Sequence, residues 1–133
     1  MIIHVDGGCS GNSQLDLTKR KMVAVATDDK GKVLVEKIQE GGSNNIAELL
    51  AVKEALMWCS VRGIKKVEIR TDSRNNLAWV YGKKVGKKIN DREMVLNLKT
   101  IILALNKSVN FSLTWIPREY NLAGQYIENK FQL

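Results

Sequence analysis

Apolar and polar residues alternate along several short segments of the chain, and alternation with a period of two predicts half-buried β-strands. The alternation is clearest near the C-terminal end, where polar residues separate Val109, Phe111 and Leu113. The segment Asp28-Asp29-Lys30-Gly31 lies between two apolar runs and is typical of a hairpin turn. We therefore expect strands at about 2–8, 20–28, 32–40, 65–71 and 109–115, with Trp115 on the same face of the last strand as Val109, Phe111 and Leu113.

Other segments have apolar residues three and four positions apart, which predicts amphipathic helices. The longest has a capping residue at Ser43 or Asn44 and ends before Gly63. The expected helices are 44–62, 74–81, 91–105 and one from about 121 onward, with buried stripes of Leu49, Val52, Leu56 and Cys59 in the first and of Met94, Leu98, Ile101, Ile102 and Leu105 in the third. The order β-β-β-α-β-α-α-β-α predicts an α/β fold in which helices cover a mixed sheet.

Length and composition predict a single domain over residues 1–133. The chain is long enough for a hydrophobic core without disulfides, and its hydrophobic content of 44% is typical of globular proteins. No apolar run approaches the roughly 20 residues that a membrane span needs. We expect no signal peptide, and the spacing of Cys9 and Cys59 predicts neither a metal site nor a disulfide. These features favour a cytoplasmic location.

The chain is basic, with 21 lysines and arginines against 14 acidic residues and a formal net charge of +7. Part of the excess lies in two clusters, residues 19–21 and residues 83–88. Each cluster alone is equally well explained as a solvated loop. Together with a concentrated acidic site, they favour a polyanionic ligand that lysines hold in place.

Three acidic residues stand where chain elements begin or end. Asp6 closes the first apolar run, Asp72 follows the fourth predicted strand, and Glu48 lies near the start of the longest predicted helix. Side chains at such positions can converge, and converging carboxylates repel one another unless a divalent cation neutralises them. Each acid alone is equally well explained as a cap or turn residue. The ordered set predicts a metal-dependent enzyme that acts on phosphates.

Four short motifs occur in one order and span most of the chain: Asp6-Gly7 with Gly11-Asn12, Asn44-Asn45 before Ala47-Glu48-Leu49, Thr71-Asp72-Ser73, and Trp115-Ile116-Pro117-Arg118-Glu119 before Asn121-Leu122-Ala123. In these motifs and their spacing the chain resembles the type 1 ribonuclease H family, whose members cut the RNA strand of RNA–DNA hybrids. The resemblance implies a five-stranded mixed sheet, three antiparallel strands followed by two parallel ones, with helices on its faces. It also implies a monomer that binds RNA–DNA hybrids and has no obligate protein partner.

The resemblance further implies a two-metal mechanism with Mg²⁺, for which Mn²⁺ can substitute. Asp6 would bridge both cations, and Glu48 and Asp72 would hold the cation that stabilises the leaving oxygen. Polar residues near these acids would contact the substrate backbone and the RNA 2′-hydroxyls. The residues implied are Asn12, Asn44, Asn45, Arg74, Asn90 and Arg118. Two of them have a structural alternative, Asn44 as a helix cap and Asn12 as a turn residue.

The chain departs from the family pattern at three places. The short segment from Gly82 to Lys88 stands where some relatives have a long basic insertion. Arg118 and Glu119 stand where a loop histidine is usual, as in a histidine-free branch of the family. The third departure is Gly124, at the position of the fourth catalytic aspartate. A glycine there supplies no side-chain ligand for the cation that prepares the attacking water.

Three interpretations of Gly124 are open at this point. Glu128, one helical turn further on, can act as a substitute ligand. The enzyme can instead work with a weaker first metal and prefer Mn²⁺, or cleavage is lost and a protein that binds hybrids or double-stranded RNA remains. We expect reduced but real endonuclease activity on the RNA strand of hybrids, because the other three acids are present. A DNA nuclease with the same fold is a further alternative, and His4 is assigned no role in the site.

Overall fold

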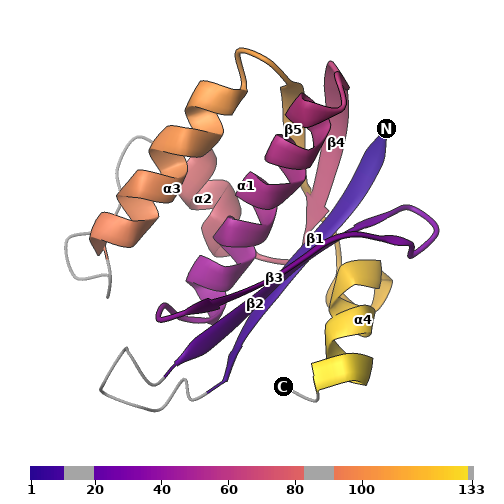
Figure 1. Ribbon diagram of the computed structural model, residues 1–133, viewed down its shortest axis with the longest axis vertical. Coiled ribbons are helices and arrows are strands. Elements are labelled where there is room, and N and C mark those ends of the chain that lie inside the picture. The colour runs from indigo at the N-terminus through magenta and orange to yellow at the C-terminus, as the bar shows by residue number, and fades with distance from the viewer. Residues whose placement is uncertain (11–19, 83–91, 132–133) are drawn as a thin grey trace.

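Five strands form one sheet in the computed structural model, which describes residues 1–10, 20–82 and 92–131. The strands are β1 (Ile2–Ser10), β2 (Lys21–Asp28), β3 (Val33–Glu40), β4 (Lys66–Thr71) and β5 (Asn110–Trp115). The helices are α1 (Asn44–Val61), α2 (Arg74–Tyr81), α3 (Arg92–Leu105) and α4 (Leu122–Phe131), and a short 3-10 helix, Arg118–Tyr120, precedes α4. Figure 1 shows α1, α2 and α3 on one face of the sheet and α4 on the other.

The strand order in the sheet is β3-β2-β1-β4-β5. β2 pairs antiparallel with both β1 and β3, whereas β4 pairs parallel with both β1 and β5. The expected sheet of three antiparallel strands followed by two parallel ones is therefore confirmed. The predicted hairpin turn joins β2 to β3, and Asp28 Oδ1 closes it by accepting the backbone amides of Lys30 and Lys32, both at 2.9 Å.

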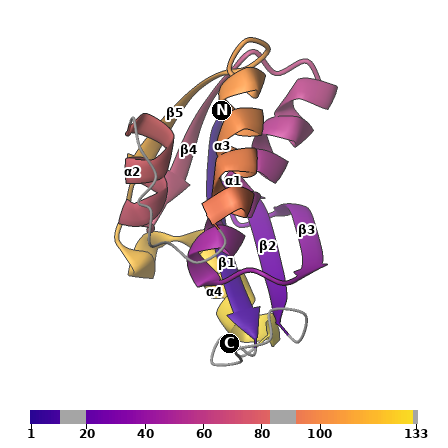
Figure 2. The same ribbon diagram turned by 90° about the vertical axis from the view of Figure 1, so that its left-hand side faces the viewer.

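β1 is the central strand and is covered on both faces. Residues 3–9 are all buried, because α1 packs against one side of the strand and α4 against the other (Figure 2). Gly7 permits the close approach of α1: a Cβ atom at this position would lie only 2.2 Å from the carbonyl carbon of Ala47. The first turn of α1 therefore rests directly on the backbone of β1, which brings the next residue, Glu48, close to Asp6.

The hydrophobic core has two unequal parts. The larger lies between the sheet and the helices α1 and α3, and it contains the whole stripe predicted for α1, namely Leu49, Val52, Leu56 and Cys59. The smaller lies between β2 and α4 and consists of Val23, Val25, Ala123 and Ile127. Since burial of apolar surface is the main stabilising term, the position of α1 is fixed more strongly than that of α4.

Two positions that were expected to be buried are exposed. Ile101 is 41% exposed, because the buried stripe of α3 runs through Val95, Leu98 and Ile102 and leaves Ile101 on its flank. Trp115 is 38% exposed, because it is the last residue of β5, the edge strand of the sheet. The alternating pattern identified the face of the strand correctly but did not indicate where the layer of helices over that face ends.

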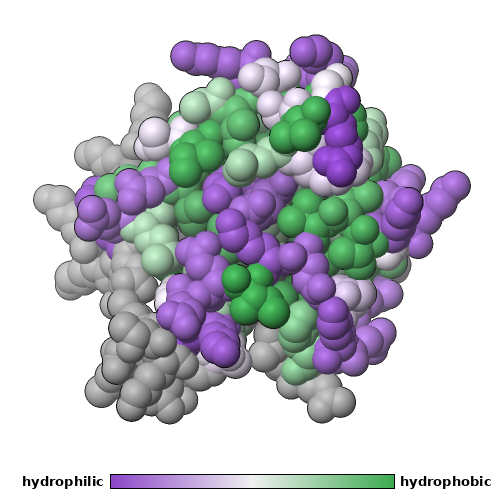
Figure 3. Space-filling model, viewed as in Figure 1, coloured by the Kyte–Doolittle hydropathy of each residue, from purple (hydrophilic) through white to green (hydrophobic). Residues whose placement is uncertain are grey.

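The face seen in Figure 1 carries a mixed surface. Hydrophilic side chains gather across its middle, and hydrophobic side chains form separate patches around them (Figure 3). Among the residues that the structure describes, no helix is both long enough and apolar enough to cross a membrane.

Candidate active site

The register between β1 and β4 places Asp6 level with Asp72. Their last parallel pair is His4 with Arg70, and the two aspartates follow two residues further along each segment. β1 continues in pairing with β2 as far as Ser10, whereas β4 ends at Thr71. The two strands are therefore no longer paired at the level of the aspartates, and a side chain from a third element can lie between them.

The third element is α1, whose start is fixed by a cap and by a backbone contact. Ser43 is the cap, since its hydroxyl accepts the amide of Ile46 at 3.3 Å. Of the two predicted caps, Asn44 is therefore not the one used, and its side chain is available for other contacts. The glycine contact with β1 holds this end of the helix against the central strand.

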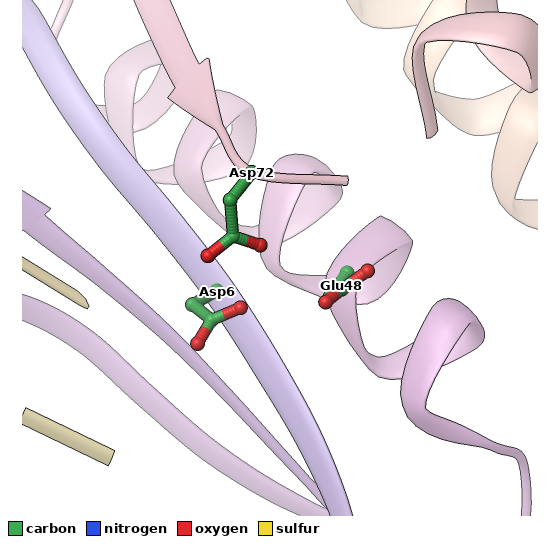
Figure 4. Close-up of side chains that lie close together, drawn as sticks. All are labelled: Asp6, Glu48 and Asp72. Atoms are coloured by element: carbon green, nitrogen blue, oxygen red, sulfur yellow. The ribbon is translucent and has the colours of Figure 1, made fainter. Parts of the chain in front are cut away.

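Glu48 of α1 completes a cluster with Asp6 and Asp72. The three side chains point toward one another from a strand, a helix and a strand end (Figure 4). One carboxylate oxygen of each residue lies within 4.8 Å of those of the others. The convergence expected from the sequence is therefore present in the fold.

The three carboxyl groups share a poorly solvated space, which raises the pKa of each. Burial raises the pKa of Asp6 to about 8, and the charges of Asp72 and Glu48 add to this effect. Burial also raises the pKa of Glu48 to about 7 and lifts the pKa of Asp72 above its usual value. Carboxylate oxygens are the ligands that hard divalent cations prefer. A cation bound here would displace the protons and relieve the repulsion, so the donor set fits such an ion.

Ser73 links Glu48 to the turn that follows β4. Its hydroxyl hydrogen-bonds to the Glu48 carboxylate and also accepts the amide of Asn76 at 3.1 Å, as the N-cap of α2. The Ser73 amide in turn donates to Thr71 Oγ1 at 3.1 Å. Asp72 lies between these two residues, so the same bonds that start α2 also fix the backbone that carries the acid.

Asn121 joins the start of α4 to the acids. This fully buried side chain donates from Nδ2 to the carbonyl of Val5 at 2.9 Å and to Asp72 Oδ2 at 3.4 Å. Its Oδ1 accepts the amides of Ala123 at 3.1 Å and Gly124 at 3.3 Å, as an N-cap does. One amide group thus fixes β1, the end of β4 and α4 relative to one another. The sequence carried a signal for the cap, an asparagine before a helix, but none for the bonds to Val5 and Asp72.

His4 supports the same junction. Its Nδ1 accepts the amide of Leu122 at 3.0 Å. The ring is buried, and burial lowers its pKa, with the charge of Arg70 adding to the effect. The residue is therefore a neutral histidine with a structural hydrogen bond at the first turn of α4.

Gly124 faces Asp6 across the junction of β1 and α4. A Cβ atom at Gly124 would lie 3.0 Å from Asp6 Oδ2, so that any side chain there requires Asp6 to give way by a few tenths of an ångström. The position that the resemblance assigns to a fourth acid is thus directly beside the cluster. In this chain Gly124 has no side chain to offer there, so that side of Asp6 faces only the backbone of α4.

An ion pair stands on the same side of the cluster. Glu128 Oε1 accepts Arg118 Nε at 3.0 Å and lies 2.9 Å from Nη2. The charge of Arg118 opposes the rise in pKa of all three acids. Both partners line a cleft of about 270 Å³ together with Asp6 and Glu48. Glu128, which one of the three interpretations of Gly124 makes a substitute ligand, is therefore near the acids but bonded to Arg118. The candidate ligand group among the described residues does not include it.

Two of the predicted substrate-binding residues lie at the start of α1, and both are exposed. Asn44 lines the cleft, and its Oδ1 accepts the amide of Cys9 at 2.7 Å. Within the part of the chain that the structure describes, its Nδ2 group has no partner and is available as a donor. The backbone carbonyl of Asn45 accepts Asn76 Nδ2 at 3.2 Å. The side chain of Asn45 is exposed at the surface. Asn12, Asn90 and the lysines at 83–88 lie outside the described residues.

Comparison with known proteins agrees with this geometry. The family model described as RNase H matches residues 1–126. LC11-RNase H1, isolated from compost by a metagenomic approach, is 28% identical over 95% of this chain and 90% of its own, with a TM-score of 0.66. The N-terminal RNase H domain of a Mycobacterium tuberculosis protein, solved as a fusion with maltose-binding protein, is 24% identical over 94% of this chain and 92% of its own, with a TM-score of 0.69. The second likeness concerns the fold alone.

A further solved structure contains a nucleic acid. It is LC11-RNase H1 in complex with an RNA/DNA hybrid, 28% identical over 90% of this chain and 87% of its own, with a TM-score of 0.61. No curated protein matches the chain at a significant level of sequence similarity. The family match, however, extends over nearly the whole chain and includes all three clustered acids. The chain therefore belongs to the ribonuclease H family of enzymes.

Proposed function

We propose that this protein cuts the RNA strand of RNA–DNA hybrids at internal positions, with divalent cations held by Asp6, Glu48 and Asp72. The observation that carries the proposal is the meeting of three carboxylates within 4.8 Å in a chain of the ribonuclease H family. The hybrid as substrate is supported by LC11-RNase H1, a 28% identical protein that has been solved with an RNA/DNA hybrid.

We assign two Mg²⁺ ions to the acids, with Mn²⁺ as a substitute, because the donors are hard carboxylate oxygens. Bound cations would polarise the scissile phosphate, activate the attacking water and stabilise the leaving oxygen. Asp6 lies between the Glu48 and Asp72 side of the cluster and the α4 side, so it is the acid suited to contact both ions. Ser73 hydrogen-bonds to Glu48 and Asn121 to Asp72, and these bonds would help to orient the two carboxylates that would hold one of the ions.

We expect the activity to be reduced, because Gly124 supplies no ligand beside Asp6. The ion on that side would depend on Asp6, substrate oxygen and water. Glu128 can contribute only if its bonds to Arg118 open. Arg118, in turn, is well placed to bind a substrate phosphate, since it lies in the cleft and its guanidinium group suits phosphate oxygens.

Recognition of RNA would come from the polar groups beside the acids. The Nδ2 donor of Asn44 and the exposed side chain of Asn45 are suited to contact RNA 2′-hydroxyls and the sugar–phosphate backbone. We assign Asn12 and Asn90 similar roles on the strength of the family resemblance. Such contacts distinguish RNA from DNA without reading the base sequence.

We propose further that the protein acts as a monomer in the cytoplasm. All groups assigned to the site come from one chain, so the chemistry needs no partner subunit. The two cysteines, Cys9 and Cys59, are both free, which suits a reducing compartment.

The second candidate function is binding of hybrids or double-stranded RNA without cleavage. Gly124 favours this candidate, because it removes a ligand from the cation that would prepare the attacking water. The contacts of Asn44, Asn45 and Arg118 with a nucleic acid would be the same in both cases. The two candidates therefore differ in whether the bound strand is cut, and the second also includes double-stranded RNA as a ligand.

One assay separates the candidates. Labelled RNA–DNA hybrid, RNA duplex and DNA duplex are incubated with the protein in Mg²⁺ or in Mn²⁺. Internal cleavage of RNA only in the hybrid supports the first candidate. This activity should disappear in Asp72→Asn and persist in Asp29→Asn, an exposed acid of the β2–β3 turn that serves as the matched control. Hybrid binding without cleavage in either metal would support the second candidate, and cleavage of the DNA duplex would contradict both.

A further inference from the structure

Arg74 is a cation whose position is fixed by an aromatic ring. It is the first residue of α2, two positions after Asp72, and it is exposed. Its guanidinium carbon lies 4.6 Å from the centroid of the Trp115 ring, in a cation–π stack. Among the described residues the guanidinium has no hydrogen-bond or ion-pair partner, so all of its donors remain available to a ligand.

Trp115 is hydrogen-bonded to the segment that carries Asp72. It pairs with Thr71 in the parallel register of β4 and β5. Its indole Nε1 donates to the carbonyl of Asp72 at 3.2 Å. The ring nevertheless stays 38% exposed. An exposed indole that is hydrogen-bonded at its edge and stacked on its face fixes the arginine relative to the acid.

The stack lies to one side of the acid cluster, along the sheet. Asp6 lies within β1, Asp72 follows the last residue of β4, and Trp115 ends β5. These three strands are adjacent in this order. Neighbouring strands are about 4.8 Å apart, so the backbone of Trp115 is roughly one strand spacing beyond that of Asp72, on the side away from Asp6. The indole reaches back to the Asp72 carbonyl. A strand whose scissile phosphate sits over the acids would bring a neighbouring phosphate toward the guanidinium.

We propose that Arg74 and Trp115 form a phosphate site for the strand that is cut, next to the scissile phosphate, in which Arg74 binds the phosphate and Trp115 is the positioning residue. This inference rests on the proposed function. Arginine presents a planar fork of donors that matches phosphate oxygens. Stacking reduces the conformational freedom that this side chain loses on binding, so the site is organised before the ligand arrives.

The chain contains a second stack that serves as a matched control. Arg62 lies 4.3 Å from the centroid of the Trp58 ring, and it is also exposed. It follows the last residue of α1, whereas Glu48 is near the first, so that most of an 18-residue helix separates it from the acids. Its Nη1 also donates to the carbonyl of Trp58 at 3.5 Å. Removal of Arg62 thus deletes the same charge and the same type of contact at a distant place.

The test measures hybrid affinity by fluorescence anisotropy in Mg²⁺, in a Glu48→Gln background that is expected to bind without cutting. Arg74→Ala should weaken binding about tenfold and should reduce the slope of log Kd against log salt by about one charge. Trp115→Leu should weaken binding about threefold, the size of an exposed cation–π contact, whereas Trp115→Phe should restore most of it. Arg62→Ala should change the affinity less than twofold, an order-of-magnitude expectation for a charge distant from the ligand.

A double-substituted variant tests whether the two residues act together. Arg74→Ala with Trp115→Leu should bind no more weakly than Arg74→Ala alone, since the ring acts through the guanidinium. If the two losses add, the role of Trp115 as a positioning residue is overturned. If Arg74→Ala behaves like Arg62→Ala while the background protein binds the hybrid, the phosphate site itself is overturned. Should Trp115→Leu fail to fold by circular dichroism, the comparison of Arg74→Ala with Arg62→Ala still decides.

Chemically modified hybrids identify the strand. Methylphosphonate linkages in the DNA strand remove its negative charges and should leave the loss caused by Arg74→Ala unchanged. If that loss disappears, Arg74 contacts the opposite strand and the proposal is wrong. A background protein that does not bind the hybrid at all would instead refute the proposed function, a result that is distinct from the other two.

Discussion

The acid cluster lies between two parts of the molecule that are built differently. On the α1 side, Gly7 allows backbone contact between helix and central strand, and the larger core holds the helix in place. On the α4 side, the core is small, Gly124 supplies no ligand, and an exposed Arg118–Glu128 pair stands beside the acids. The difference indicates that the α1 side determines where the acids are, whereas the α4 side determines how many carboxylates the cluster contains and the balance of charge around them.

The strongest test of this comparison is Gly7→Ala. The added methyl group would lie 2.2 Å from the carbonyl carbon of Ala47, a backbone atom that cannot move without moving α1. We expect a loss of about 3 kcal/mol or more in the free energy of unfolding, measured by urea denaturation. Gly63→Ala is the control: the new atom meets nothing within 4 Å, and only the positive φ of 72° opposes it, so about 1 kcal/mol is expected. Equal losses in the two variants would refute the importance of the Gly7 contact.

Asp6→Asn should stabilise the metal-free protein, and the gain should depend on pH. The ordinary pKa of this carboxyl is 3.8, whereas in the fold it is about 8. Below about pH 4 the group is protonated in both states. As the pH rises toward 8, only the unfolded chain ionises freely, so the free energy of unfolding of the unsubstituted protein falls. We expect little difference at pH 4 and a gain of at least about 2 kcal/mol at pH 8, where the full shift of the pKa corresponds to roughly 5 kcal/mol.

Thermal unfolding across this pH range checks the prediction for Asp6. Mg²⁺ should narrow the gap at pH 8, because a cation that binds the folded acids stabilises the unsubstituted protein more than the variant. Asp29→Asn, in an exposed turn, should show no such pH-dependent gain. A gain that is the same at pH 4 and pH 8 would contradict the electrostatic explanation.

Gly124→Asp sharpens the comparison from the α4 side. The new carboxylate would stand beside Asp6 and complete the ligand set, so cleavage of the hybrid in Mg²⁺ should become at least about tenfold faster. Gly124→Asn is the control, because its Cβ atom meets the same Asp6 oxygen at 3.0 Å but it brings no charge. If the two variants cut at the same rate, the absence of a carboxylate at position 124 does not limit cleavage.

The smallest effect is expected for Glu128→Gln. The pair with Arg118 is well exposed, with side-chain exposures of 68% and 51%, and exposed pairs contribute at most about 1 kcal/mol. Urea denaturation should detect a loss of about 0.5 kcal/mol or less. Glu119→Gln, an exposed acid on the same short helix as Arg118 that makes no ion pair with it, is the control. A loss several times larger for Glu128 would mean that this pair is part of the framework on the α4 side.

The fold was largely predictable because its elements follow from local patterns. The alternation in β5, the turn between β2 and β3 and the stripe of α1 depend on residues that are close in sequence. The meeting of the acids was predicted for a related reason, because strand ends and helix starts gather at one edge of such a sheet. This reason holds for Asp72 and Glu48 but not for Asp6, which lies inside β1 because that strand continues to Ser10. The exposure of Trp115 was not predictable, because alternation does not reveal where a helical layer stops.

The contacts that support the site could not be predicted from the sequence. Asn121 bonds to Val5 and Asp72, which are 116 and 49 positions away, and no local pattern encodes such a partner. The pairing of Arg118 with Glu128 likewise depends on how the 3-10 helix and α4 pack against each other. The roles of Asn12 and Asn90 stay predictions, because these residues lie outside the described part of the chain.

The parallel register of β1 and β4 affects which folded molecules are stable. A slip of β4 by one residue would move Asp72 off the level of Asp6, and it would also turn Val67 and Ile69 out of the apolar layer in which they are buried. A misaligned molecule would thus lose packing and the convergence of the acids in the same event. Molecules that survive heat or a protease should therefore be those in which the three acids are correctly aligned.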